Sequence, residues 1–227
     1  MIKKILITLL LILIFTSFAR TQTDSIKKDT SIYLKNPRYL EQTKLYDIYK
    51  MKRAKIVMLG NSITHGANWN ELINRKDVVE RGISGDLTSG FLHRLKYVYN
   101  LKPKICFIMG GINDIIYGKQ VDEVFQNLIK IADSLKSHKI KIVLQSTLFI
   151  KNGSSFLDTI NVRVKSLNIQ LKKYASINNI IFLDLNKKLS VDNHLKEEHT
   201  IDGVHLSALG YKIWSNYILQ TLIKLKI

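Results

Sequence analysis

The sequence has 227 residues and a formal net charge of +17, with 35 Lys and Arg against 18 Asp and Glu. That length allows one domain with a sizeable core, and with two prolines and no Ser/Gly-rich block the chain shows no linker. The basic residues are scattered and form no arginine-rich patch interleaved with aromatics, which argues against nucleic-acid binding. The charge indicates either weak contact with anionic envelope polymers or headgroups, or a Lys/Ile/Asn-rich genome. The single cysteine, Cys106, lies in an apolar run, which excludes an intrachain disulfide and favours a small buried hydrophobe.

The N-terminus has its own pattern. Two lysines within Met1–Lys4 precede the apolar stretch Ile5–Phe15, and small residues follow before the chain turns polar. This pattern predicts a secretory signal peptide over residues 1–19 and an exported protein, periplasmic or secreted; an uncleaved N-terminal anchor is the alternative. Residues 20–36 are expected to be irregular.

Beyond residue 36 the chain reads as alternating helices and short buried strands. A helix is predicted after Pro37, with an apolar stripe at Tyr39, Leu40, Leu45, Ile48 and Tyr49. The apolar runs predict strands at Lys55–Leu59, Val78–Glu80, Ile105–Met109, Ile140–Gln145 and Ile180–Asp184. Amphipathic stretches predict helices near 87–100, 121–137, 160–177 and 207–226. This alternation favours a parallel sheet covered by helices on both faces.

Polar turns follow three of the predicted strands, at Gly60–Ser62, Gly82–Asp86 and Gly110–Asp114. Right-handed crossovers bring the carboxyl ends of parallel strands to one edge of the sheet. Ligands bind at that edge in open α/β sheets. The three turns therefore mark the predicted site.

Ser62 is the candidate nucleophile in the first turn. A serine hydroxyl needs a neighbouring imidazole to take its proton, and the imidazole needs a carboxylate to orient it. The nearby His65 would be aimed elsewhere by the turn, whereas Asp202 and His205, three residues apart before the last predicted helix, have suitable spacing. The alternatives are that Ser62 and Asp202 are helix caps.

An ester-cleaving serine also needs donors for the negative charge on the carbonyl oxygen. The backbone N–H groups of Ser62 and Gly85 and the side-chain amide of Asn113 follow predicted strands and suit this role. Alternatively, Asn113 is a turn residue with an unusual backbone conformation.

Four sequence blocks, "GNSIT", "GISGD", "GGIND" and "DGVHLSALGY", occur in this order over roughly residues 55 to 215. In this order they resemble the GDSL/SGNH hydrolases, especially the platelet-activating-factor acetylhydrolase-like and bacterial acetylesterase-like members. The resemblance implies a flavodoxin-like three-layer α/β/α fold with a five-stranded parallel sheet, here a single domain over residues 37–227. It implies neither a cofactor nor a metal.

The same resemblance implies roles for the site residues. Ser62 is the nucleophile, His205 the general base and then acid, and Asp202 its orienting carboxylate. Gly85, Asn113 and the Ser62 amide form the oxyanion hole.

One residue departs from the family pattern, because Asn61 stands where the GDSL block has Asp. Asn keeps the size and hydrogen-bonding capacity but drops the charge, so activity is expected to survive. Asn61, His65 and Trp69 follow or flank the nucleophile and are candidate pocket residues; for His65 and Trp69 a packing role is the alternative.

Four further acidic or basic groups lie near the expected site. Asp86 and Asp114 are interpreted as capping or loop-bracing residues. His194 and His199 lie in the loop before Asp202, with Glu197 and Glu198 between them. Their spacing fits no standard zinc signature and favours a solvated loop over a metal site.

The predicted function is that of an exported serine esterase that removes a short acyl group, acetyl above all, from oxygen esters of carbohydrates. The substrate would be a small molecule or a glycan. A lysophospholipase or thioesterase of the same fold and a non-catalytic envelope glycan-binding protein are the alternatives. The longest loops after strands, about 147–160 and 185–200, are the expected specificity elements.

Overall fold

In the computed structural model, residues 32–227 are described and form a sheet of five parallel strands. The strand order is β2-β1-β3-β4-β5. The strands are β1 (Ile56–Gly60), β2 (Val78–Gly82), β3 (Ile105–Met109), β4 (Lys141–Gln145) and β5 (Ile181–Leu183). All four pairings are parallel. The predicted α/β class and five-stranded parallel sheet are confirmed.

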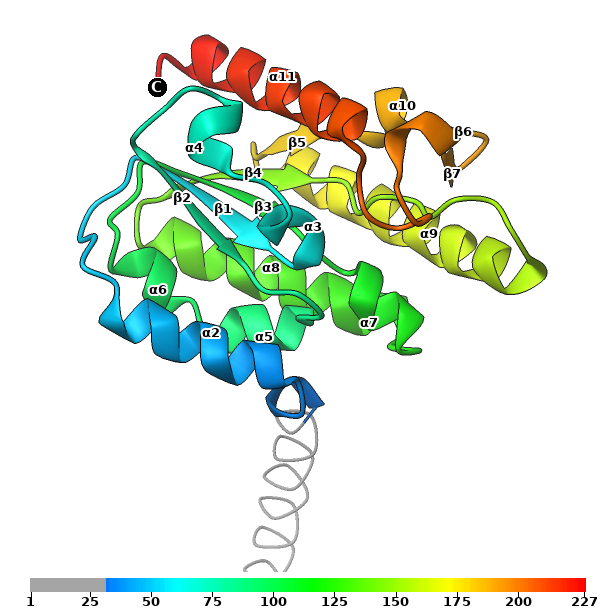
Figure 1. The fold of residues 1–227 in the computed structure, drawn as a ribbon, viewed down its shortest axis with the longest axis horizontal. Coiled ribbons are helices and arrows are strands. Elements are labelled where there is room, and N and C mark those ends of the chain that lie inside the picture. Colours follow the sequence, from blue (N-terminus) through cyan, green and yellow to red (C-terminus); the bar gives the residue numbers. More distant parts are fainter. Residues whose placement is uncertain (1–31) are drawn as a thin grey trace, which may run out of the picture.

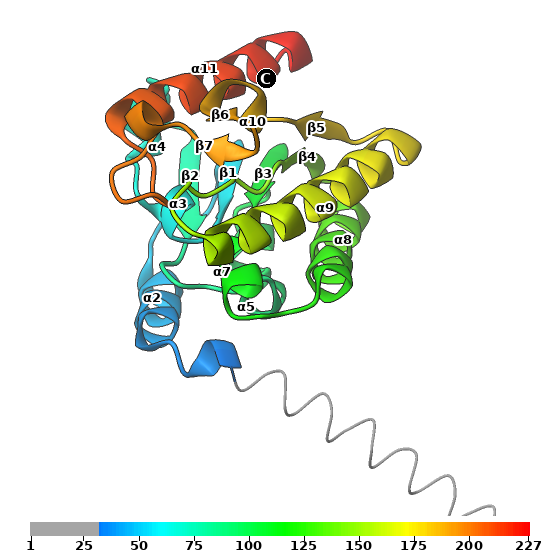
Figure 2. The ribbon, with the colours of Figure 1, turned by 90° about the vertical axis from the view of Figure 1, so that its right-hand side faces the viewer.

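Helices cover the sheet on both faces, which gives the expected three layers (Figures 1 and 2). One face carries α4 (Trp69–Leu72) and the long C-terminal α11 (Ala208–Leu225). The other carries α2 (Pro37–Ile48), α5 (Thr88–His93), α6 (Lys96–Tyr99), α8 (Val121–Ser137) and α9 (Ser155–Ile177). Within the described residues, no helix is long and apolar enough to span a membrane.

Short elements surround the carboxyl ends of the strands. They are α3 (Ser62–His65), α7 (Ile112–Ile116), α10 (Asn186–Leu189), the antiparallel pair β6 (Ser190–Val191) and β7 (His194–Leu195), and the 3₁₀ turn η1 (Glu197–His199). The sequence pattern did not predict these elements, since each is too short to show an apolar period.

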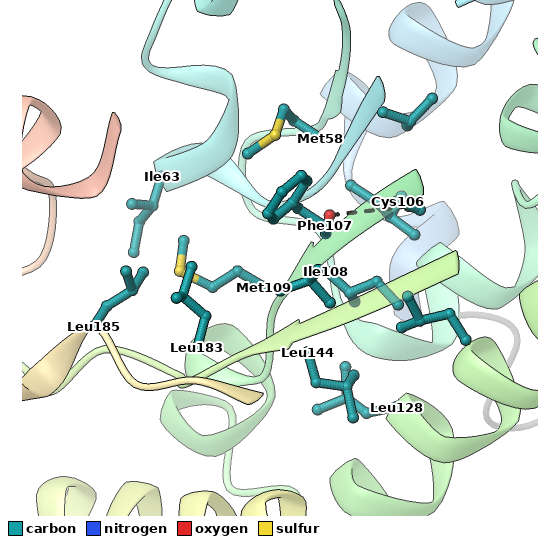
Figure 3. Close-up of a cluster of buried hydrophobic side chains, with 14 of the residues drawn as sticks. Met58, Ile63, Cys106, Phe107, Ile108, Met109, Leu128, Leu144, Leu183 and Leu185 are labelled. Atoms are coloured by element: carbon teal, nitrogen blue, oxygen red, sulfur yellow. Dashed lines mark hydrogen bonds between the residues drawn. The ribbon is translucent and has the colours of Figure 1, made fainter. Parts of the chain in front are cut away.

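The core explains why the central strands read as continuous apolar runs. Every residue of β1 and β3 is buried, because helices cover both of their faces. Figure 3 shows Phe107 and Ile108 of β3 packed among side chains from neighbouring strands and helices. Each such side chain contributes roughly 1.5–3 kcal/mol on full burial. Cys106 is one of them, as predicted, and burial raises the pKa of its thiol.

Helix α2 forms where predicted, but it buries a different face from the predicted one. Tyr39 and Tyr46 are its buried residues, whereas Leu40, Leu45, Ile48 and Tyr49 of the predicted stripe are exposed. The two tyrosines sit seven residues apart on one face and hydrogen-bond to the main chain, Tyr46 to the Gly82 carbonyl at 3.0 Å and Tyr39 to the Gly90 carbonyl at 3.3 Å. Their hydroxyl groups therefore tie α2 to the end of β2 and to α5.

Element boundaries differ from the prediction in two further places. The stretch near 87–100 forms two short helices rather than one, and α9 begins at Ser155 because the side chain of Ser154 caps it by accepting the Leu157 N–H. At the N-terminus, the signal peptide predicted over 1–19 lies outside the described residues. So does most of the segment 20–36, of which 32–34 form a helical turn.

Candidate active site

Ser62 stands at the first position of α3, directly after β1. The side chain of Asn61 caps this short helix by accepting the Ile63 N–H at 3.1 Å. At Gly60 a Cβ would overlap the Thr64 hydroxyl and lie 2.8 Å from the Met109 carbonyl oxygen. Glycine therefore leaves room for α3 and the end of β3 to pack closely against the end of β1, directly before Ser62.

His205 reaches Ser62 from a loop that is 143 positions away in the sequence. Its Nε2 lies 2.9 Å from the Ser62 Oγ, and its Nδ1 lies 2.6 Å from Asp202 Oδ2. The structure thus brings Ser62, His205 and Asp202 into one hydrogen-bonded chain. Figure 1 shows the loop before α11 descending toward α3.

The Asp202 carboxylate is held by the loop that carries it. Its second oxygen accepts the backbone N–H groups of Val204 at 2.9 Å and of His205 at 2.7 Å. Partial burial acts to raise the pKa of Asp202, but these bonds and the bond to the His205 ring outweigh it, so the pKa is lowered. The carboxylate is therefore kept ionised beside the imidazole.

Three contacts hold the backbone of this loop. The Thr200 hydroxyl donates to the His205 carbonyl and accepts the Gly203 N–H, both at 2.8 Å. The Lys151 N–H donates to the Gly203 carbonyl at 2.8 Å, which ties the loop to the segment after β4. Gly203 has φ +92°, a conformation that favours glycine. The "DG" of the motif thus sets the shape of the loop.

The expected oxyanion donors also lie at this edge. Gly85 has φ +74° and is exposed, and neither its N–H nor that of Ser62 donates a hydrogen bond to another group within residues 32–227. Asn113 lies in the first turn of α7, and its side-chain amide donates to the Asp86 carbonyl at 2.9 Å. One amide hydrogen of Asn113 is therefore engaged in orienting the side chain toward the Gly85 loop, and the other is available to a ligand.

A buried arginine that sequence reasoning missed joins these pieces. Arg94 is fully buried, and its guanidinium donates to Asp86 Oδ2 at 2.7 Å and to the carbonyls of Gly60 and Arg81, both at 2.8 Å. It therefore connects the end of β1, the end of β2 and the loop that carries Gly85. Its sequence position inside a predicted amphipathic helix gave no sign of this role.

The two carboxylates beside the site brace loops, as predicted. Asp86 accepts the Leu87 N–H at 2.9 Å as well as the Arg94 guanidinium. Asp114 accepts the Thr88 hydroxyl at 2.7 Å and the Thr88 N–H at 3.1 Å. Burial raises the pKa of each to about 6, for Asp86 against the opposing effect of Arg94.

The candidate pocket residues fall in different places. Trp69 is fully buried, donates to the Thr64 carbonyl at 2.7 Å and packs on Trp214 with ring centroids 4.6 Å apart, so the structure selects its packing role over a pocket role. His65 is half-exposed with its Nδ1 3.5 Å from Glu80, and the hydrogen bond to Glu80 raises the His65 pKa. Asn61 is buried as the cap described above.

The two histidines before Asp202 are not one solvated cluster. His194 bonds Asp158 at 2.9 Å, whereas His199 is buried with its Nδ1 3.0 Å from the Leu189 carbonyl oxygen. The prediction of a solvated loop is therefore wrong for His199, because its ring fills the space under α10. Among residues 32–227, no group of three His, Cys, Asp or Glu side chains is arranged to hold a metal ion.

Solved structures resemble this fold over most of its length. A GDSL-like lipase from Bacteroides thetaiotaomicron is 29% identical, with a TM-score of 0.71, over 82% of this chain and 97% of the other. A lipase/acylhydrolase from Enterococcus faecalis is 26% identical, with a TM-score of 0.65, over 74% of this chain and 95% of the other.

The similarity to curated protein sequences covers a shorter part of the chain than the similarity to solved structures. An N-acylneuraminate cytidylyltransferase from Streptococcus agalactiae serotype V is 33% identical over 102 residues, 44% of this chain. The aligned segment spans only 24% of the length of that relative.

A model of the GDSL-like lipase/acylhydrolase family matches residues 58–213, which include the Ser62 turn, the Gly85 loop, Asn113 and the Asp202–His205 loop. This chain therefore belongs to the GDSL-like lipase/acylhydrolase family.

Proposed function

We propose that this family member is an exported serine esterase that removes short acyl groups, acetyl above all, from oxygen esters of carbohydrates. The observation that carries the proposal is the hydrogen-bonded chain from Ser62 through His205 to Asp202. An imidazole bonded on one side to a hydroxyl and on the other to an ionised carboxylate is arranged to take the hydroxyl proton.

In the proposed reaction, Ser62 Oγ attacks the ester carbonyl while His205 Nε2 takes its proton. The oxyanion is stabilised by the N–H groups of Ser62 and Gly85 and the free amide hydrogen of Asn113; one such donor is worth roughly 3–4 kcal/mol. His205 then protonates the departing alcohol, and an acyl-enzyme remains. A water activated by His205 hydrolyses this ester and restores Ser62.

Two observations support a sugar alcohol. The streptococcal relatives are named for N-acylneuraminate, a sugar derivative. The segments after β1 and β3 run directly into short helices, and only a short loop separates β2 from α5, so that the described residues provide no inserted lid over the site there. Such an open edge suits a bulky alcohol with a small acyl group better than a long acyl chain.

The first test is labelling and turnover by the purified protein. We expect a fluorophosphonate probe to label Ser62 and Ser62→Ala to abolish both labelling and hydrolysis of p-nitrophenyl acetate without loss of the cooperative unfolding transition. Ser137→Ala, which changes an exposed serine in the last turn of α8, should retain both. A folded wild-type protein that neither reacts nor turns over would support the binding-protein alternative.

The preferred acyl-chain length distinguishes a short-chain esterase from a lysophospholipase or thioesterase. Rates on p-nitrophenyl acetate and on long-chain p-nitrophenyl esters should favour acetate strongly. A clear preference for long chains would overturn the acetyl proposal in favour of a lysophospholipase or thioesterase.

A further inference from the structure

A cavity of about 520 Å³ opens beside Gly85. The segment that leads into α2 forms one wall and the loop after β2 forms the other, and Tyr117 at the end of α7 completes the lining. Pockets of a few hundred Å³ are the usual size for small-molecule ligands. Because Gly85 is both a lining residue and an expected oxyanion donor, the cavity adjoins the position of the reacting ester.

The wall formed by the N-terminal segment is fixed to the site. The side-chain amide of Asn36 donates to the Ser84 carbonyl at 2.8 Å, and a Cβ at Gly85 would lie 3.2 Å from the same nitrogen. The tyrosines of α2 anchor the rest of the helix, as described above. The cavity is thus bounded by two parts of the chain in direct contact.

The lining carries positive charge and no balancing carboxylate. Lys35 and Arg38 are exposed lining residues, and within the described part of the chain neither forms an ion pair. The charge of Arg38 also acts on His65, the last residue of α3, where it opposes the effect of Glu80 on the His65 pKa. The charge of Arg38 is therefore felt at the end of the helix that begins with Ser62.

The remaining lining is apolar and aromatic. Ile32, Pro37 and Leu87 contribute apolar surface, and Tyr117 is 69% exposed. An exposed tyrosine ring offers a rigid apolar face with a polar tip. A sugar ring, with apolar C–H faces and polar edges, is complementary to such a surface.

We propose that this cavity binds the alcohol part of the substrate and selects an acidic sugar, whose carboxylate pairs with Lys35 and Arg38 while its ring packs on Tyr117. The inference rests on the proposed esterase function and adds to it a substrate class and three specificity-determining residues. Neither cation takes part in the chemistry, so their effect is on which ester is preferred.

The test compares an anionic ester with its neutral counterpart, 4-acetoxybenzoate against methyl 4-acetoxybenzoate, at pH 7.5. For each ester the wild-type value of kcat/KM is divided by that of Lys35→Gln/Arg38→Gln, so that differences in leaving-group reactivity cancel. We expect the loss on the anionic ester to exceed the loss on the neutral ester about tenfold, since each exposed charge pair contributes up to about a factor of five.

The matched control is Lys52→Gln/Arg53→Gln, which also removes one lysine and one arginine. Both are exposed, and they precede β1 at the opposite edge of the sheet. This variant should lower the two values equally. If Lys35→Gln/Arg38→Gln also lowers kcat/KM equally for the anionic and the neutral ester, the inference is overturned and the esterase proposal stands. If the wild-type protein hydrolyses neither ester, both are overturned.

A second pair of substrates identifies the source of the anion. An O-acetylated hexuronic acid and a lysophosphatidate both carry a negative group near an ester. A charge-dependent loss in Lys35→Gln/Arg38→Gln with the acetylated sugar acid supports the proposal. A loss confined to the lysophosphatidate overturns the sugar assignment. Circular dichroism of each variant verifies that the fold is retained.

Discussion

At the scale of single residues, Asp202 does two things with its two oxygens. One accepts the His205 ring at 2.6 Å, and the other accepts two backbone N–H groups of its own loop. The carboxylate therefore orients the imidazole and also shapes the loop that delivers it. Asn61 shows the opposite case, since its amide oxygen caps α3 as a carboxylate would, without adding charge beside Ser62.

The two partners of Ser62 should differ in their effect on turnover. His205→Ala removes the group that takes the proton and should lower kcat by about 10⁵-fold or more. Asp202→Asn keeps an oxygen for the two backbone N–H groups but presents an amide to the imidazole, so we expect a smaller loss, about 10²- to 10⁴-fold. Steady-state kinetics on p-nitrophenyl acetate measure both; an equal or larger loss for Asp202→Asn would contradict an orienting role.

At the scale of elements, Arg94 joins three segments that each carry part of the site. β1 leads to Ser62, β2 leads to the Gly85 loop, and α5 supplies Arg94 through its C-terminal end. The guanidinium donates to the end of β1, to the end of β2 and to Asp86 beside Gly85, from a position without solvent access. Its fork of donors satisfies carbonyls and a carboxylate in one plane, which a lysine would not reproduce.

Arg94→Met should therefore destabilise the protein strongly. It removes the guanidinium from the Gly60 and Arg81 carbonyls and from the buried Asp86 carboxylate, which keeps only the Leu87 N–H. Removing one partner of a buried ion pair typically costs about 3–5 kcal/mol. Urea unfolding followed by circular dichroism measures the loss. Lys44→Met breaks the exposed ion pair with Glu41 on α2 and should cost no more than about 1 kcal/mol. Similar losses in the free energy of unfolding for the two variants would mean that Arg94 does not hold these segments together.

At the scale of the whole molecule, two buried carboxyls give the fold a pH dependence of definite sign. Burial raises the pKa of Asp114 and of Asp86 to about 6 from an ordinary value of 3.8. Between these values the folded protein holds more protons than the unfolded chain. The contribution of these groups to stability is thus largest below about pH 4 and is lost as the pH rises through 6.

Replacing Asp114 with Asn isolates one of these contributions. The amide oxygen can still accept from Thr88, but the group no longer ionises, so we expect the free energy of unfolding relative to wild type to increase between pH 4.5 and pH 7, by about 2 kcal/mol. Urea titrations at both pH values provide the comparison. Asp192→Asn, at an exposed carboxyl, should show no such change, and a parallel pH profile for Asp114→Asn would refute the assignment.

The sequence by itself determined the fold class and the main elements. The runs that became β1, β3 and β4 were found within one residue of their observed limits, and α8 was found with its observed limits, because burial on both faces of a strand and on one face of a helix leaves a local pattern. The four polar blocks also fixed which turns would meet at the sheet edge, since parallel topology brings strand ends together.

Tertiary structure alone decided the contacts that make these turns into a site. The bond between Ser62 and His205 joins residues 143 positions apart, and nothing near either residue encodes its 2.9 Å length. The same holds for Arg94, which looks like a surface residue of an amphipathic helix, and for the wall that Asn36 attaches beside Gly85. The spacing of apolar residues along the sequence indicates which residues are buried. Which residue each of them contacts depends on how elements distant in the sequence pack together.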